Sequence, residues 1–162
     1  MTMRKILFRG KSLKDGQWRQ GSLFVANYNG KDINVLITNP VIDRTTKASS
    51  SNGLEFDEAD VDVPDPHTVG QYIGLNDKNG KGIFEGDIVR WDDLSNGKYW
   101  RFAVVRLAPD ILFDCRPIIA VEGIKNSSIG VFAFSSFIYT ETDKHLEVIG
   151  NMFDNPDLVK QS

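Results

Sequence analysis

The sequence predicts an all-β protein built from many short antiparallel strands. Val, Ile, Thr and the aromatic residues, which favour strands, account for 51 of the 162 residues, whereas Ala, Leu and Glu account for only 24. Gly, Asn and Asp, which let the chain reverse direction, account for another 41. No long segment repeats its apolar residues at the helical period of 3.6. This pattern is typical of a barrel or a sandwich, with at most a short C-terminal helical turn.

The strands expected in the first part of the chain are separated by turn signals. We expect strands at 4–9, 18–28 and 33–37. Asp15-Gly16 and Asn29-Gly30 tolerate a positive φ and predict the turns between them. The polar run at 44–53 predicts a surface loop. In the acidic segment 54–66, valines alternate with aspartates, which predicts a short edge strand that Pro64 and Pro66 end.

The remaining strands are expected between polar turns up to the last residues. Their predicted ranges are 68–75, 83–91, 99–108, 111–115, 116–121, 129–140 and 145–153. Within 83–91, Gly86 is expected to let the strand bend sharply. Residues 154–159 predict one helical turn, with Asn155 as the N-cap and Pro156 at the first helical position.

The length of the chain suits one domain or two very small ones. We expect an N-terminal β module at 1–67, holding the loop and the acidic strand, and a β-barrel module at 68–162, which together could also form one compact unit. Residues 14–24 weakly echo residues 78–89, since both combine a K-[DN]-G turn, an aromatic strand and a glycine. A duplication and convergence on the same hairpin chemistry both stay open.

Composition indicates a cytoplasmic protein. The net charge is −3, and the single cysteine, Cys115, leaves no intramolecular disulfide and fits a reducing compartment. The longest apolar runs fall short of the 18 residues that a transmembrane helix needs. The first residues have too short an apolar core for a signal peptide.

Three motifs in order give the chain a resemblance to a known family. They are Ile6-Leu7-Phe8-Arg9-Gly10 near the start, the stretch from Gln71 to Val89 in the centre, and the stretch from Glu147 to Leu158 at the end. In these motifs the sequence resembles the YopX family of bacteriophage and prophage proteins. Gly82 stands where a charged residue is common in the family, and Phe84 where Tyr is common.

The resemblance implies a mostly β protein with an SH3-like barrel, encoded by a phage or prophage. The family has no established activity and supplies no catalytic residues to carry over. The motif positions read as structural turn residues: Gly74, Asp77, Asn79, Gly80, Gly86, Asp87, Gly150, Asn151 and Pro156.

The residues themselves predict no enzyme, no metal site and no cofactor. An EF-hand frame on Asp77 to Gly80 would place Leu75 and Gly86 at the two obligatory carboxylate positions. His67 and His145 lack the spacing of a zinc site. A nucleophile–base pair of Cys115 with either histidine stays open, but a small apolar role for the cysteine is favoured. Phosphate-binding glycine motifs are absent.

Basic residues near the N-terminus are candidates for contacts with nucleic acid. Residues 1–53 carry a charge of +6, whereas 54–66 carry −6. The candidates are Arg4, Arg9, Lys11 and Arg19 with Trp18, because cations beside an aromatic ring could hold phosphates and stack bases. Solvated charges at the ends of barrel strands are the favoured interpretation, and we expect only weak, non-specific affinity.

A homo-oligomer is suggested by the apolar stretch 129–139, whose alternate positions are apolar on both faces. Candidate interface residues are Phe132, Phe134 and Phe137. Alternatively, a second module of the same chain packs against the outer face of this stretch, and this interpretation is slightly favoured.

Together these observations predict a non-enzymatic phage or prophage accessory protein, or a protein-interaction module, whose partner is an unknown phage or host protein. The alternative is a nucleic-acid-binding module that uses the basic N-terminal face. No contact with a membrane is expected.

Overall fold

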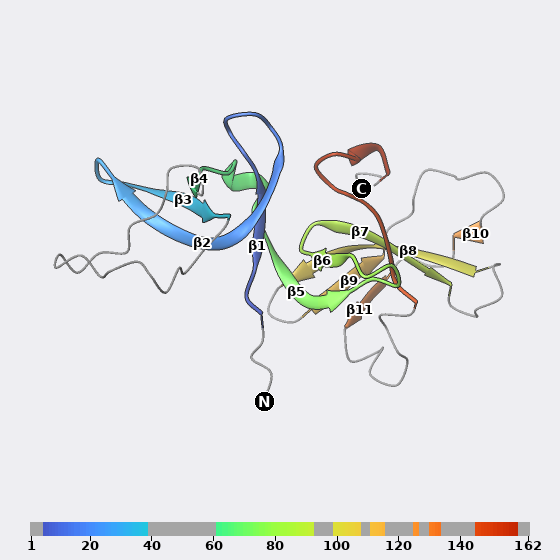
Figure 1. Cartoon of the computed structure of the whole chain (residues 1–162). Helices are drawn as coiled ribbons and strands as arrows, with labels where there is room; N and C mark the ends of the chain where they lie inside the picture. Colours follow the sequence, from blue (N-terminus) through green and yellow to red (C-terminus); the bar gives the residue numbers. More distant parts are fainter. Residues whose placement is uncertain are drawn as a thin grey trace. The chain divides into compact units, whose positions relative to one another are not determined.

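The computed structural model describes residues 5–38, 61–92, 99–107, 111–115, 125–126, 130–133 and 145–158. The chain divides into two compact units, one at Lys5–Gly70 and one that begins at Gln71. The sequence places this boundary after His67. Strands dominate both units, and the only helical elements in the described residues are two 3-10 turns, so the all-β prediction is confirmed (Figure 1).

The first unit contains an antiparallel sheet in the order β4-β3-β2-β1. Its strands are β1 (Phe8–Lys11), β2 (Trp18–Tyr28), β3 (Lys31–Ile37) and β4 (Val61–Asp62). The strand predicted at 4–9 therefore begins later and extends further than expected. The turn at 12–17 sets the register, which pairs Lys11 with Trp18 and ends at Phe8 opposite Gly21. Ile6 lies before this ladder and is 65% exposed.

Strand β2 changes its pairing partner at Gly21. Residues up to Gly21 pair with β1, and residues from Ser22 pair with β3. A Cβ added at Gly21 would overlap the carbonyl oxygen of Ile37, so only glycine permits this close crossing. Beyond it, Ser22–Ile37 form a two-stranded hairpin, called the arm below. Its turn has φ of 52° at Asn29 and 76° at Gly30, which confirms the predicted hairpin turn (Figure 1).

Strand β4 is the short edge strand that the alternating valines and aspartates predict. It pairs with β3 only at Leu36 and Ile37. Pro64 follows, bridged to Ser12, and prevents the strand from continuing along the arm. The sequence did not predict the 3-10 turn η2 (Pro66–Thr68), in which the carboxylate of Asp65 accepts a hydrogen bond from the His67 N–H.

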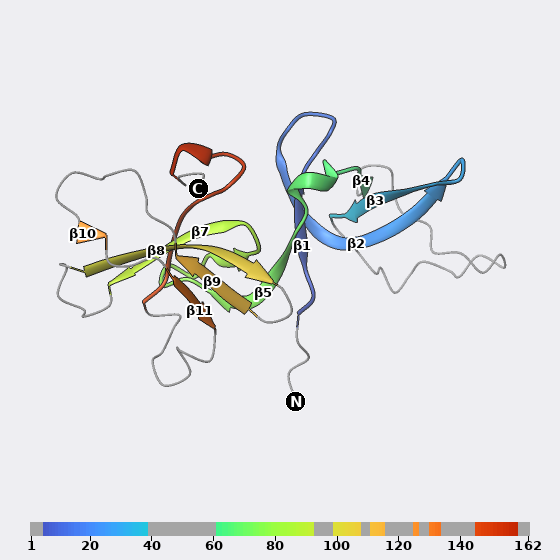
Figure 2. The same ribbon diagram turned by 180° about the vertical axis from the view of Figure 1, so that it is seen from behind.

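The second unit contains a sheet in the order β11-β9-β8-β7-β12. Figure 2 shows β7, β8 and β9 side by side, as their antiparallel pairing requires. Strand β10 pairs with β8 in parallel, and β5 forms a hairpin with β6. The elements are β5 (Gly70–Asn76), β6 (Gly82–Phe84), β7 (Asp87–Asp92), β8 (Tyr99–Leu107), β9 (Ile111–Cys115), β10 (Lys125–Asn126), β11 (Gly130–Ala133), β12 (Glu147–Asn151) and η5 (Pro156–Leu158).

The prediction of one bent strand at 83–91 was wrong, because the chain forms two strands there. Gly86 has a φ of 82° and lies in a turn between β6 and β7. The buried carboxylate of Asp87 accepts a hydrogen bond from the Phe84 N–H across this turn. The helical turn predicted near the C-terminus is confirmed as η5. The strand predicted at 116–121 lies outside the described residues, as does most of the one at 129–140.

The apolar core of the second unit lies on one face of its sheet. It is formed by Ile73, Ile83, Val89, Trp91, Ala103, Val105, Phe113 and Leu146. Ile88, Phe102 and Val104 occupy the opposite face of the same strands and are also buried. The sheet is therefore covered on both faces. The described strands form open sheets and no closed barrel.

Candidate interaction surface

The structure brings together three of the predicted nucleic-acid residues on one face of the N-terminal sheet. The register puts Lys11 opposite Trp18 and Arg9 beside them, opposite Gln20. The Arg9 guanidinium lies 4.7 Å and the Lys11 ammonium 5.7 Å from the centroid of the Trp18 ring. These distances are typical of cation–π contacts. Arg9 is only 7% exposed, so it supports the indole ring more than it faces solvent.

The structure separates Arg19 from this group. Arg19 lies opposite Gly10 on the other face of the sheet. Its guanidinium is 2.7 Å from the carboxylate of Asp15 and 3.5 Å from that of Asp62. A hydrogen bond from the Gln17 N–H, with help from Arg19, holds the pKa of Asp15 below its ordinary value. Arg4 lies outside the described residues.

Alternation along β2 and β3 sorts the charges of this sheet by face. One face carries Lys11, Trp18, Phe24, Tyr28 and Lys31, which we call the strip. Ala26, Ile33 and Val35 lie between its aromatic residues. Asp32 and Asp62 occupy the opposite face, together with Arg19. Among the described residues of these four strands, the face that bears the strip therefore holds cations and no carboxylate.

The arm exposes large apolar side chains. Phe24 is 49%, Val25 65% and Tyr28 68% exposed. Phe24, Tyr28 and Lys31 were not predicted as site residues, because neither ring stands next to a basic residue in the chain. The signal that could have found them is that Trp18, Phe24 and Tyr28 are separated by even numbers of residues within one predicted strand, which places the three rings on one face.

In the second unit, Asp77 of the central motif joins its own turn to the last strand. One carboxylate oxygen accepts hydrogen bonds from the N–H groups of Asn79 (2.8 Å) and Lys81 (2.9 Å), and the other accepts from Val148 (3.1 Å). Burial raises the pKa of Asp77, but these N–H donors together outweigh burial and lower it below its ordinary value. The carboxylate is therefore a structural group. The calcium interpretation, which the sequence already disfavoured, gains no support from this arrangement.

The central and C-terminal motifs also meet at Gly86, and the C-terminal motif folds back on itself at Gly150. Met152 N–H donates a hydrogen bond to the carbonyl of Gly86, and a Cβ on Gly86 would lie 3.0 Å from the Phe153 ring. A Cβ on Gly150 would overlap the side-chain oxygen of Asn155, which accepts a hydrogen bond from the Asn151 N–H. Asn155 directly precedes η5, at the predicted N-cap position, but its side chain bonds back to β12.

Of the other motif positions, Gly80 lies in a turn, whereas Gly74 lies inside β5, where the register with β6 shifts between Tyr72 and Asn76. Gly74 and Gly80 have positive φ, the side-chain oxygen of Asn151 accepts hydrogen bonds from the N–H groups of residues 153 and 154, and Pro156 begins η5.

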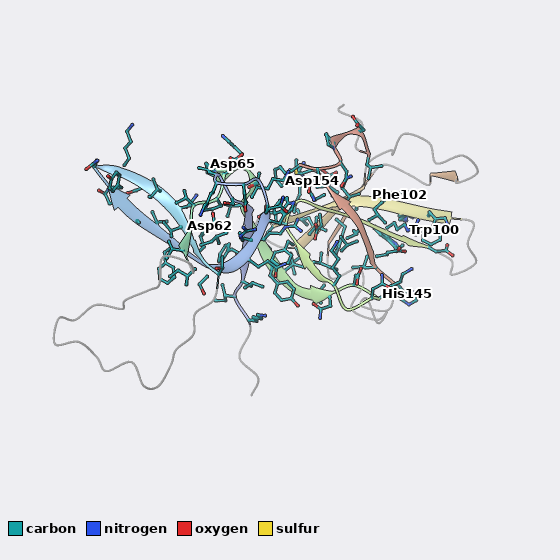
Figure 3. The ribbon with its side chains drawn as sticks, turned by 45° about the horizontal axis from the view of Figure 1, so that its top comes forward. Asp62, Asp65, Trp100, Phe102, His145 and Asp154 are labelled. Atoms are coloured by element: carbon teal, nitrogen blue, oxygen red, sulfur yellow. The ribbon has the colours of Figure 1, made fainter. Side chains whose placement is uncertain are left out.

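A row of charged and aromatic side chains crosses the second sheet. Glu147 lies 2.7 Å from the ammonium of Lys78 and accepts two hydrogen bonds from Arg90. These hydrogen bonds, chiefly those from Arg90, lower the pKa of Glu147. The Arg90 guanidinium in turn lies 5.0 Å from the ring centroid of Trp100, which Figure 3 labels on β8 beside Phe102. The row clamps neighbouring strands, with Lys78 and Arg90 sharing the carboxylate of Glu147.

The described residues contain no group of three or more His, Cys, Asp or Glu side chains that could hold a metal ion. His67 and His145 are both exposed, and Cys115 ends β9. In the same parts of the chain, no helix is long and apolar enough to cross a membrane.

The predicted oligomer interface lies largely beyond what the structure describes. Phe134 and Phe137 are outside the described residues. Phe132 belongs to β11, where the register places it opposite the buried Phe113 of β9.

Comparison with known proteins identifies a family. No curated protein matches the chain. Among solved structures, the crystal structure of protein EF1440 from Enterococcus faecalis is similar at 19% identity, with a TM-score of 0.43 over 98% of this chain and 100% of that one. Residues 7–160 match the family described as YopX protein, and these residues span nearly the whole chain. The chain therefore belongs to the YopX family.

Proposed function

We propose that this chain is a non-enzymatic accessory module of a phage or prophage that binds another macromolecule through the arm of its first unit. The observation that carries the proposal is the exposure of Phe24 and Tyr28 on one face of a two-stranded hairpin. A hairpin of two strands is marginally stable alone. Large apolar side chains on such an element are a common mark of a binding surface.

The same proposal includes three properties that the sequence predicts. The second unit is a variant of the SH3-like barrel, an assignment supported by the antiparallel β7-β8-β9 meander with β12 returning to pair with β7. The protein acts in the cytoplasm of the bacterial host. A homo-oligomer would form through the segment around Phe132, Phe134 and Phe137, separately from the arm.

Affinity capture from phage-infected or induced cells tests the binding role. The full chain is compared with the double variant Phe24→Ser/Tyr28→Ser, and Met152→Ser serves as the control because Met152 is exposed on the second unit. We expect the double variant to lose its captured partner and the control to retain it. If the folded double variant captures the same partners as the unmodified chain, the arm is not the binding surface.

Nucleic acid is the second candidate partner, and the strip is the specific observation that favours it. The strip combines rings and cations without a carboxylate among the described residues of its face. The arginines predicted from the sequence support nucleic-acid binding less strongly, because Arg9 is nearly buried and Arg19 is paired with two carboxylates.

A further inference from the structure

The charge of the strip restricts what can cover the arm. Lys11 lies near one end and Lys31 at the hairpin tip, whereas Asp32 lies on the opposite face. Packing the strip against the same strip of a second copy would bring cations near cations, at a cost in free energy. Charge complementarity therefore favours an anionic partner over a second copy of this chain.

The aromatic residues further narrow the chemistry of that partner. Phe24 and Tyr28 are four residues apart on one strand, so their rings lie roughly 14 Å apart along it. Trp18 follows on the same face, where Arg9 and Lys11 hold its ring. Flat apolar rings between cations are suited to a ligand that alternates flat bases with phosphates. An acidic protein surface would satisfy the cations but has no need for a series of rings.

The length of the strip also fits an extended strand. From Trp18 to Tyr28, β2 extends roughly 34 Å at about 3.4 Å per residue. This length is suited to several nucleotides, within the range of about 4–16 that small β-folds bind. The open, strand-borne surface would admit unpaired bases, whereas a duplex hides its base faces in the stack.

From these observations we infer that the strip binds single-stranded nucleic acid. Bases stack on Phe24 and Tyr28, and the ammonium groups of Lys11 and Lys31 contact phosphates. Trp18 lies at the end of the path, and Arg9 fixes its ring. The inference rests on the proposed role of the arm as the binding surface and adds the class of ligand.

Fluorescence anisotropy with a labelled twelve-nucleotide oligo(dT) tests the inference on the full chain. We expect micromolar binding at low salt, weakened roughly tenfold or more in Phe24→Ala/Tyr28→Ala because base–aromatic stacking is lost. Val25→Ala is the matched control, since Val25 is 65% exposed on the opposite face of the same strand. Circular dichroism confirms that each variant is folded.

The salt dependence tests the two lysines separately. Two phosphate contacts to a single strand predict a slope of about −1.4 in log K against log salt, and Lys31→Gln should reduce its magnitude by about 0.7. Lys78→Gln, on the second unit, should leave the slope unchanged.

Two results would overturn the inference. One is the absence of oligo(dT) binding by the folded chain at low salt. The other is equal weakening by Val25→Ala and by the double aromatic variant. If affinity capture nevertheless yields a protein that depends on Phe24 and Tyr28, the proposed binding role stands and only the nucleic-acid ligand is wrong. Loss of both signals would overturn both proposals.

Discussion

Both units of this chain are built mainly from antiparallel strands, but the second unit buries its large apolar side chains whereas the arm of the first exposes several of them. The second unit buries an apolar cluster around Phe113 and Val105, both 0% exposed, and ties its turns with buried carboxylates. The first unit extends an eleven-residue strand whose last five residues are all exposed. The buried apolar residues of its described strands are Leu36 and Ile37, at the base of the arm.

This difference suggests that stability and binding reside in separate parts of the chain. The motifs that carry the family resemblance meet mainly in the second unit, where Asp77 bonds to Val148 and Gly86 bonds to Met152. The strip lies in the first unit. Substitutions in the second unit should therefore destabilise the protein, whereas substitutions in the strip of the first unit should change binding.

The largest effect is expected from Phe113→Ala. The ring is fully buried and meets Trp91 edge to face at 6.2 Å, so its removal should cost about 3–5 kcal/mol of unfolding free energy. Tyr28→Ala, on the exposed arm, should cost no more than about 0.5 kcal/mol. Urea unfolding monitored by tryptophan fluorescence measures both. Equal costs would contradict the separation of roles.

Asp77→Ala should lower the free energy of unfolding by about 2–4 kcal/mol, because three backbone N–H groups lose their buried hydrogen-bond acceptor. Asp77→Asn retains one acceptor oxygen and should cost less. The counterpart in the first unit is Asp65→Ala, which removes one capping bond to His67 and should cost about 1 kcal/mol. Thermal unfolding of the three variants would refute this order if Asp65→Ala were the most damaging.

Gly30 in the first unit and Gly86 in the second have similar positive φ angles, so the costs of replacing each with alanine can be compared directly. Gly30→Ala, with φ of 76° and open space around its Cβ, should cost about 1–2 kcal/mol from strain alone. Gly86→Ala has φ of 82° and in addition meets the Phe153 ring at 3.0 Å, so its cost should be higher. Equal costs for the two variants in chemical denaturation would show that the Phe153 ring moves aside freely.

The smallest change in the free energy of unfolding is expected when the pH is lowered. Because folding lowers the pKa of Asp77 and of Glu147, their stabilisation is complete above their unfolded pKa values, near 4. It should be lost as the pH falls through the lower, folded values. Unfolding free energies measured between pH 5 and 2 should therefore fall less steeply in Asp77→Asn than in the unmodified chain. An unchanged slope would mean that Asp77 does not contribute.

Local chemistry explains which parts of the fold could be predicted. Asn29-Gly30 closes a hairpin wherever two strands flank it, so β2, its turn and β3 followed from neighbouring residues. The break at Gly86 was harder to predict, because a glycine between apolar residues is compatible with both a bend and a turn. The residues that hold the turn, Val105 and Met152, are far from it in the chain. The similar segments 14–24 and 78–89 also differ in structure. Gly21 lies inside the continuous strand β2, whereas Gly86 lies in a turn between two strands.

The sequence by itself determined the strand-rich class, the hairpin turns at Asp15-Gly16 and Asn29-Gly30, and the family, because these depend on residue type and short-range spacing. Tertiary structure alone decided which charges act together. Arg9 and Arg19 look equivalent in the sequence, yet pairing with β1 places one against Trp18 and the other against Asp15 and Asp62. It also decided that Asp62 of β4 lies on the face of Arg19, since the pairing of segments that are far apart in the chain does not follow from neighbouring residues.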